Sequence, residues 1–221
     1  MKAKLISHSK SSGYLIKSTS PLELIAFCAR VSNPENQFNT ETSEKLVKYL
    51  VKHKHWSPLE MVSACLEIET TRDIARQILR HRSFSFQEFS QRYADPTKEM
   101  EFVIREARIQ DHSNRQNSID VDDDKDLQRG WELAQRNVIH EAKLAYKWAI
   151  QNGIAKEQAR AVLPEGNTVS RMYVNGTLRS WVHYIELRSG NGTQKEHAEI
   201  ARECAYAISS VFPLVNDFVS E

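Results

Sequence analysis

MVSACLEIET, residues 61–70, alternates apolar and polar side chains along its whole length. An alternation with a period of two is typical of a strand that buries one face. The residues that follow, 71–79, place four apolar side chains at helical spacing, and Thr70 or Thr71 can cap this helix. A half-buried strand that leads straight into an amphipathic helix predicts a fold that combines sheet and helices.

Further strands and helices are predicted on both sides of this pair. Short strands are expected at 5–6, 14–16, 100–104 and 167–175, and an ordered loop at 83–93. Ser20, Ser57 and Thr193 are each followed three residues later by glutamate, a capping pattern that predicts a helix start. Other helices are expected after Thr40 or Thr42, from Gly130 to 152, at 157–163 and over 177–188.

No change in composition marks a domain boundary. We therefore predict one α+β domain over residues 1–221, with a central, mostly antiparallel sheet flanked by helices. Residues 106–129 differ from the rest because they are polar and include five aspartates between Asp120 and Asp126. This segment predicts a mobile insertion or a lid.

Charge and cysteine content exclude several classes of protein. Thirty basic and 29 acidic residues leave a net charge of +1, so no overall field attracts nucleic acid. No apolar run is long enough to span a membrane, and the start lacks the apolar core of a signal peptide. The three cysteines, Cys28, Cys65 and Cys204, lie far apart in apolar patterns and predict buried thiols in a reducing cytoplasm. We expect a cytoplasmic protein without nucleic-acid, membrane or metal partners.

The segment Arg80–Arg92, RHRSFSFQEFSQR, is the strongest candidate for a binding site. Three arginines and three serines are interleaved with three phenylalanines. Arginine forks suit the oxygen atoms of phosphate, and the aromatic rings offer stacking surface. Two alternatives remain: the arginines could lie on a solvated helix end, and Arg92 could pair with Glu88. A non-catalytic nucleotide- or RNA-binding module would use the same residue types.

Read as a whole, Arg-His-Arg, two residues, Ser, four residues, Ser, one residue, Arg resembles the signature of the flavin-dependent thymidylate synthases. Four further segments resemble the family in the family's order: Ala29–Ser32, His55–Glu60, Ala159–Pro164 and Asn175–Arg188. The resemblance implies methylation of dUMP at C5 to give dTMP. It also implies 5,10-methylenetetrahydrofolate as carbon donor, FAD reduced by NADPH as hydride source, and a homotetramer with active sites at subunit interfaces.

The resemblance also implies roles for individual residues. Arg188 matches the family's catalytic arginine, which favours ionisation at N3 of the uracil ring. The positions that match dUMP-binding residues are Gln77, Arg80, Glu88, Phe89, Ser90, Gln91, Arg92, Arg160 and Arg188. The positions that match FAD-binding residues are Ser32, His55, Ser57, Arg80, His81, Arg82, Gln87, Glu88, Thr177, Arg179 and His183. Gln87 and His183 depart from the asparagine found in some members.

The sequence also lacks the features of two other kinds of site, which agrees with the resemblance. A cysteine-dependent thymidylate synthase needs a nucleophilic thiol, whereas all three cysteines here sit in apolar patterns. No Gly-x-Gly-x-x-Gly occurs, so a Rossmann flavin site is not expected. Arg179 and His183 share one helix face and Arg188 lies on the other, which suggests different ligands or different subunits. A flavoprotein that acts on another pyrimidine is the main enzymatic alternative.

Overall fold

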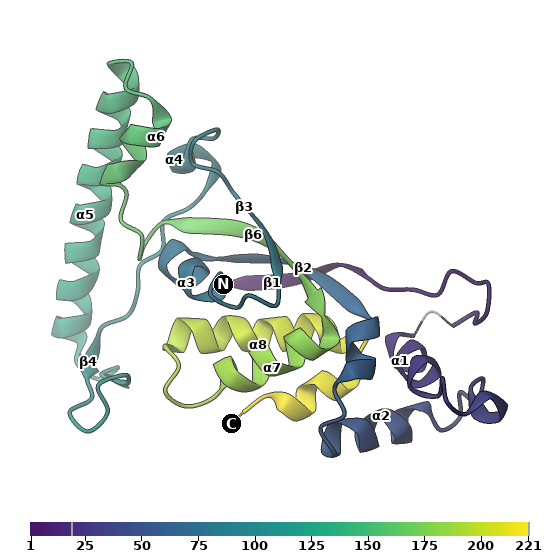
Figure 1. Cartoon of the computed structure of the whole chain (residues 1–221). Helices are drawn as coiled ribbons and strands as arrows, with labels where there is room; N and C mark the ends of the chain where they lie inside the picture. Colours follow the sequence, from purple (N-terminus) through teal and green to yellow (C-terminus); the bar gives the residue numbers. More distant parts are fainter. Residues whose placement is uncertain (19, 221) are drawn as a thin grey trace.

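The computed structural model describes residues 1–18 and 20–220, and it centres on a four-stranded sheet (Figure 1). The strand order is β1 (Lys2–His8), β2 (Ser63–Thr71), β6 (Val169–Thr177) and β3 (Ser85–Glu88). Every neighbouring pair runs antiparallel. The alternation at 61–70 therefore does form a strand, and that strand lies in the interior of the sheet.

One face of the sheet is covered by helices (Figure 1). The inward side chains of β2 and β6 include Leu66 and Val174, which are directly opposite each other in the register. They join one hydrophobic core with α3 (Arg72–Ile78), α7 (Leu178–Ser189) and α8 (Lys195–Ser209). Trp181 of α7 is buried in this core, and its indole N–H donates to the carbonyl oxygen of Ala64 at 3.0 Å. The predicted α+β class with helices flanking an antiparallel sheet is confirmed.

Two helical groups lie at opposite ends of the sheet (Figure 1). At one end, α1 (Pro21–Ala29) packs on α2 (Ser43–Lys52), next to the short helices η1 (Pro34–Asn36) and η2 (Ser57–Met61). At the other end, the long helix α5 (Lys125–Gln151) packs on α6 (Lys156–Ala159) and η3 (Arg160–Val162). The remaining elements are α4 (Pro96–Glu99), the paired strands β4 (Arg108–Gln110) and β5 (Ser118–Asp120), and η4 (Pro213–Phe218). None of the described helices is long and apolar enough to cross a membrane.

Three strand and loop predictions are wrong. Residues 14–16 form no strand, and Tyr14 is 89% exposed, because the apolar side chains there meet no core surface. Residues 100–104 form no strand beyond a single bridge between Phe102 and Thr168. The expected loop at 83–93 contains the edge strand β3, because Phe84 and Phe86 turn inward onto the main core.

Some predicted boundaries also move. The helix expected from Gly130 begins earlier, at Lys125, where the Asp124 side chain accepts from the Leu127 N–H. The expected insertion at 106–129 therefore contains the β4–β5 hairpin and the first turn of α5. α8 begins after Gln194 rather than after Thr193. Cys204 is fully buried as predicted, whereas Cys28 and Cys65 are only partly buried, and all three are unpaired thiols.

Candidate active site

The end of α3 and the last turn of α7 meet at the Arg-His-Arg motif. The Nε atom of Arg188 donates to Nε2 of His81 at 3.0 Å, across 107 positions of the sequence. Because arginine has donors only, this ring nitrogen of His81 must accept. Burial, assisted by the charges of Arg188 and Arg80, lowers the pKa of His81 to about 4. His81 is therefore a neutral ring that orients the guanidinium of Arg188.

Gln77, one turn before this motif, contacts the start of α8. Its amide nitrogen donates to Oε1 of Gln194 at 2.9 Å, and its oxygen lies 3.0 Å from Nδ1 of His197. Gln194 and His197 were not among the predicted site residues. No local pattern marks them, since their partner lies 117 and 120 positions away in the sequence.

Glu88, at the end of β3, accepts three hydrogen bonds. Its carboxylate oxygens accept from the guanidinium groups of Arg72 at 3.3 Å and Arg76 at 3.5 Å, and from the hydroxyl group of Ser170 at 2.8 Å. These three partners were also missed by the sequence reasoning. The suggested pair between Glu88 and Arg92 is wrong, because α3 and β6 already surround the carboxylate.

Arg92 instead contacts Glu157, with 3.5 Å between its guanidinium and the carboxylate. The Nε atom of Arg160 donates to the main-chain oxygen of the same Glu157 at 3.3 Å. Two of the predicted nucleotide-binding arginines are thus gathered at one place. Ser90 and Gln91 precede Arg92, and the amide nitrogen of Gln91 is buried without a partner among the described residues.

The opposite face of α7 forms a separate group. Arg179 makes an ion pair with Glu60 at the end of η2. His183 packs edge-to-face on Trp56, with 4.7 Å between ring centroids. Burial and the nearby charge of Arg179 lower the pKa of His183. The predicted separation of Arg179 and His183 from Arg188 is confirmed by these contacts, while Thr177 caps the helix by accepting from the Ser180 N–H.

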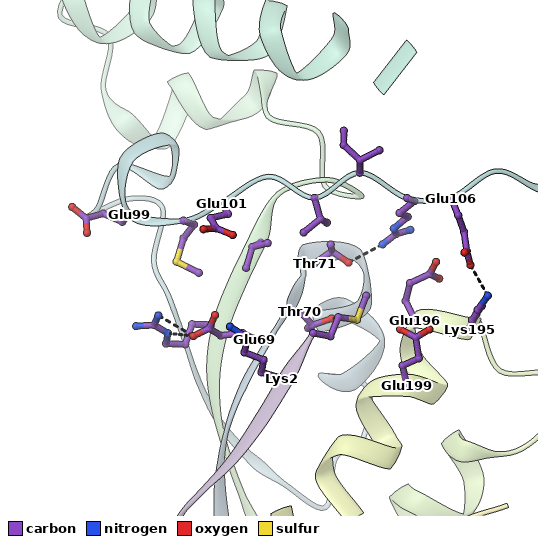
Figure 2. A pocket seen from close by; sticks show the side chains of 17 residues that line it. Lys2, Glu69, Thr70, Thr71, Glu99, Glu101, Glu106, Lys195, Glu196 and Glu199 are labelled. Atoms are coloured by element: carbon purple, nitrogen blue, oxygen red, sulfur yellow. Dashed lines mark hydrogen bonds and ion pairs between the residues drawn. The ribbon is translucent and has the colours of Figure 1, made fainter. Parts of the chain in front are cut away.

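The larger cavities lie beside these groups, not at them. A cavity of about 700 Å³ is enclosed by β1, β2, the segment 99–106 and α8 (Figure 2). Six glutamates line it: Glu69, Glu99, Glu101, Glu106, Glu196 and Glu199. A second cavity, of about 720 Å³, lies under the β4–β5 hairpin and includes Gln194. Neither is lined by a predicted site residue, and the described residues contain no cluster of metal-ligating side chains.

Comparison with known proteins identifies the family. Residues 14–214 match the family described as "Thymidylate synthase complementing protein". A "Probable flavin-dependent thymidylate synthase" of Paramecium bursaria Chlorella virus 1 is 47% identical over 97% of both chains. A "Flavin-dependent thymidylate synthase" of Synechocystis is 50% identical over 89% of this chain and 88% of its own.

The chain belongs to the flavin-dependent thymidylate synthase family. Its fold is also that of a solved UMP/dUMP methylase, PolB from Streptomyces cacaoi bound with 5-Br dUMP, with a TM-score of 0.76 and 24% identity. That match covers 98% of this chain and 93% of the other.

In this member of the flavin-dependent thymidylate synthase family, the predicted site residues fall into three regions. The first region lies around the end of α3 and contains Gln77, Arg80, His81, Arg82 and Arg188. The second lies near the end of β3 and contains Glu88, Phe89, Ser90, Gln91, Arg92 and Arg160. The third lies near η2 and contains Ser57, Arg179 and His183. Ser32 and His55 are exposed beyond the ends of α1 and α2, and Gln87 is exposed on β3. Arg188 contacts His81, whereas Arg92 and Arg160 both contact Glu157, so these two groups have no contact partner in common among the described residues.

Proposed function

We propose that this protein methylates dUMP to dTMP as an FAD-dependent thymidylate synthase. 5,10-Methylenetetrahydrofolate is the carbon donor, and NADPH reduces the flavin. The contact between Arg188 and His81 carries the proposal, because it joins two family motifs that are distant in the sequence into one arrangement. The match to the family over nearly the whole chain supports the same reaction class.

Arg188 stabilises the anionic form of the uracil ring. A guanidinium stays charged at physiological pH and has no acceptor, so it does not take a proton from N3 itself. Among the described residues Arg188 donates only through Nε, to His81, which leaves its terminal nitrogens for a ligand. Held in this way, the charge is already in place where negative charge develops.

Arg92 and Arg160 bind the phosphate of the nucleotide, together with Ser90. The ion pair between Arg92 and Glu157 is more than half exposed on the side of Arg92, and exposed pairs contribute little. A phosphate dianion offers stronger, bidentate contacts and replaces the carboxylate as partner. Glu157 then keeps both arginines close to each other before the nucleotide binds.

The donor set near η2 and the Arg-His-Arg motif fits the flavin. Arg80 and Arg82 are exposed, and Arg179 is partly exposed, so they can meet a dinucleotide pyrophosphate. The aromatic pair Trp56–His183 adds a surface for a planar ring. When bound, the reduced flavin supplies the hydride that completes the methyl group.

The sites are completed by assembly as a homotetramer. α5 presents an outward apolar stripe in which Trp131, Val138 and Trp148 are 46%, 54% and 61% exposed. Their exposure excludes these side chains from the core of a single chain and leaves them available for a subunit contact. Arg188 and the phosphate arginines have no contact partner in common among the described residues, and a neighbouring subunit completes the site by bringing the two regions together. A cytoplasmic location stays a prediction.

The proposal is tested with purified protein, added FAD, dUMP, 5,10-methylenetetrahydrofolate and NADPH. We expect a visible flavin spectrum and chromatographically detected dTMP, with UMP in place of dUMP as the matched comparison for the alternative pyrimidine. Arg188→Ala should form no dTMP while it still binds flavin and dUMP, whereas Lys10→Ala, at an exposed position just after β1, should behave as wild type. Protein that neither carries nor takes up flavin contradicts the function, and full turnover by Arg188→Ala contradicts its role.

A further inference from the structure

A directed chain of hydrogen bonds fixes the side chain of Gln77. The carboxylate of Glu196 can only accept, so the amide nitrogen of Gln194 must face it, and the two atoms lie 2.9 Å apart. The amide oxygen of Gln194 then accepts from the amide nitrogen of Gln77 at 2.9 Å. The remaining oxygen of Gln77 accepts from Nδ1 of His197 at 3.0 Å. Every donor in this chain points towards Glu196.

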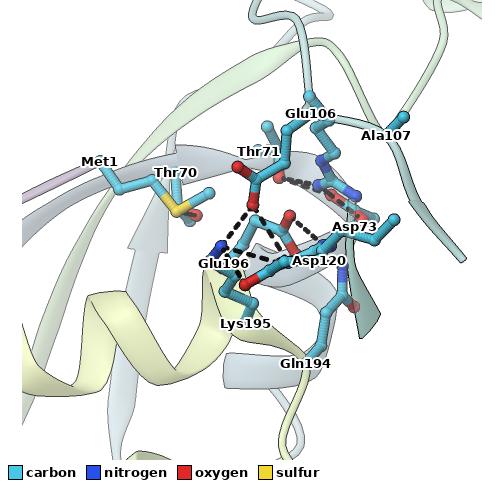
Figure 3. Close-up of polar contacts among 12 residues, drawn as sticks. Met1, Thr70, Thr71, Asp73, Glu106, Ala107, Asp120, Gln194, Lys195 and Glu196 are labelled. Atoms are coloured by element: carbon cyan, nitrogen blue, oxygen red, sulfur yellow. Dashed lines mark hydrogen bonds and ion pairs between the residues drawn. The ribbon is translucent and has the colours of Figure 1, made fainter. Parts of the chain in front are cut away.

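The Glu196 end of the chain is anchored by the β4–β5 hairpin. Glu196 is buried, and its other oxygen receives the guanidinium of Arg108 from β4. The neighbouring Lys195 reaches Glu106 at 2.6 Å and Asp120 at 3.1 Å (Figure 3). The carboxylate is therefore held by an ion pair shielded from solvent, and the segment predicted as an insertion or lid is attached to the start of α8.

The other end of the hydrogen-bond chain, at His197, lies beside His81, the residue that orients Arg188. His197 is 0% exposed and packs against His81 and Tyr184, with ring centroids 6.5 and 5.8 Å away. Its Nδ1 carries the proton, so Nε2 is an acceptor, and this atom is buried without a partner in the described part of the chain. Burial, with the charges of Arg188 and His81, lowers the pKa of His197 to about 3, so the ring stays neutral.

We propose that His197, Gln194 and Glu196 are positioning residues that hold the Gln77 amide in one orientation at the nucleotide site. Arg108 fixes the end of the chain. An amide has two donor hydrogens and two lone pairs on oxygen, and the chain uses one of each. Gln77 therefore keeps one donor and one acceptor, both with fixed directions, for the bound nucleotide. This inference rests on the proposed function, which assigns Gln77 to dUMP binding.

The test compares His197→Phe, which removes the donor to Gln77, with His197→Gln, which restores an N–H. Flavin-loaded proteins are titrated with dUMP by calorimetry, and kcat and KM are measured at pH 7.5. We expect His197→Phe to raise the dUMP Kd and KM about tenfold, with flavin content unchanged and kcat within about threefold. His197→Gln should stay within about threefold of wild type. Glu199→Gln, an exposed carboxylate on the same helix, should match wild type.

Gln194→Ala is the second variant, for use if His197→Phe does not fold, and it should raise the dUMP KM by about two- to tenfold. Unchanged dUMP binding in both variants overturns the positioning role while the proposed function stands. Equal losses in His197→Phe and His197→Gln also overturn it, because packing alone then accounts for the effect. A wild-type protein that binds no dUMP overturns the proposed function and this inference together.

Discussion

Acidification should destabilise the protein through His197, and the effect can be isolated by mutation. Folding lowers the pKa of this ring from about 6.5 to about 3, chiefly because the imidazole is buried. Between these two values the unfolded chain binds a proton that the folded chain does not. The contribution of His197 to the free energy of unfolding is therefore fully present above pH 6.5. It decreases as the pH drops below that value and levels off near pH 3.

The magnitude follows from the unfolded state. At pH 5 the unfolded ring is protonated and the folded ring is not, so the free energy of unfolding falls by about 2 kcal/mol relative to pH 7.5. Because the pKa of His197 in the folded chain lies far below pH 5, the size of this loss depends little on the value of that pKa. His81, with a pKa lowered to about 4, acts in the same direction. His197→Gln should remove only the contribution of His197.

The assay is urea unfolding followed by tryptophan fluorescence at pH 7.5, 6.5, 5.5 and 5.0. Protein concentration is held constant, because subunit association changes apparent stability. The loss between pH 7.5 and 5 should be smaller in His197→Gln than in wild type by about 2 kcal/mol. His112→Gln, at an exposed position between β4 and β5, should leave the wild-type dependence. Identical pH dependence in wild type and His197→Gln refutes the reasoning.

Three further predictions concern other regions. Arg92→Ala should weaken dUMP binding by about 1.5–3 kcal/mol, the range for hydrogen bonds to charged groups, and an unchanged dissociation constant argues against phosphate contact. Gly176→Ala should lower the free energy of unfolding by about 1–3 kcal/mol, because the added methyl group overlaps the Phe84 ring. Gly130→Ala should stabilise α5 by roughly 0.5–1 kcal/mol, because its added methyl group meets no atom within 4 Å. Urea unfolding that reverses this order contradicts the packing argument. Trp148→Glu should reduce the assembly mass measured by light scattering, and an unchanged mass removes α5 from the subunit contact.

Local pattern was enough to predict the elements that bury a continuous apolar face. The alternation at 61–70 predicted β2, and the spacing of apolar residues predicted α2 and α3, because each pattern repeats with the period of its own backbone. The capping pattern at Ser20 also placed the start of α1 at Pro21. The arginines and serines of residues 80–92, with four other segments, were enough to identify the family.

Contacts between distant segments were decided only by the tertiary structure. Apolar residues at 14–16 resemble a strand but find no surface to cover, while the irregular segment after Arg82 becomes β3 because its phenylalanines reach the core. Arg92 pairs with Glu157 instead of Glu88, although Glu88 is nearer in the sequence. Gln77 meets His197 across 120 positions. Sequence periodicity fixes which face a residue occupies, but the partner on the facing element depends on how helices and strands dock, and no local pattern records that docking.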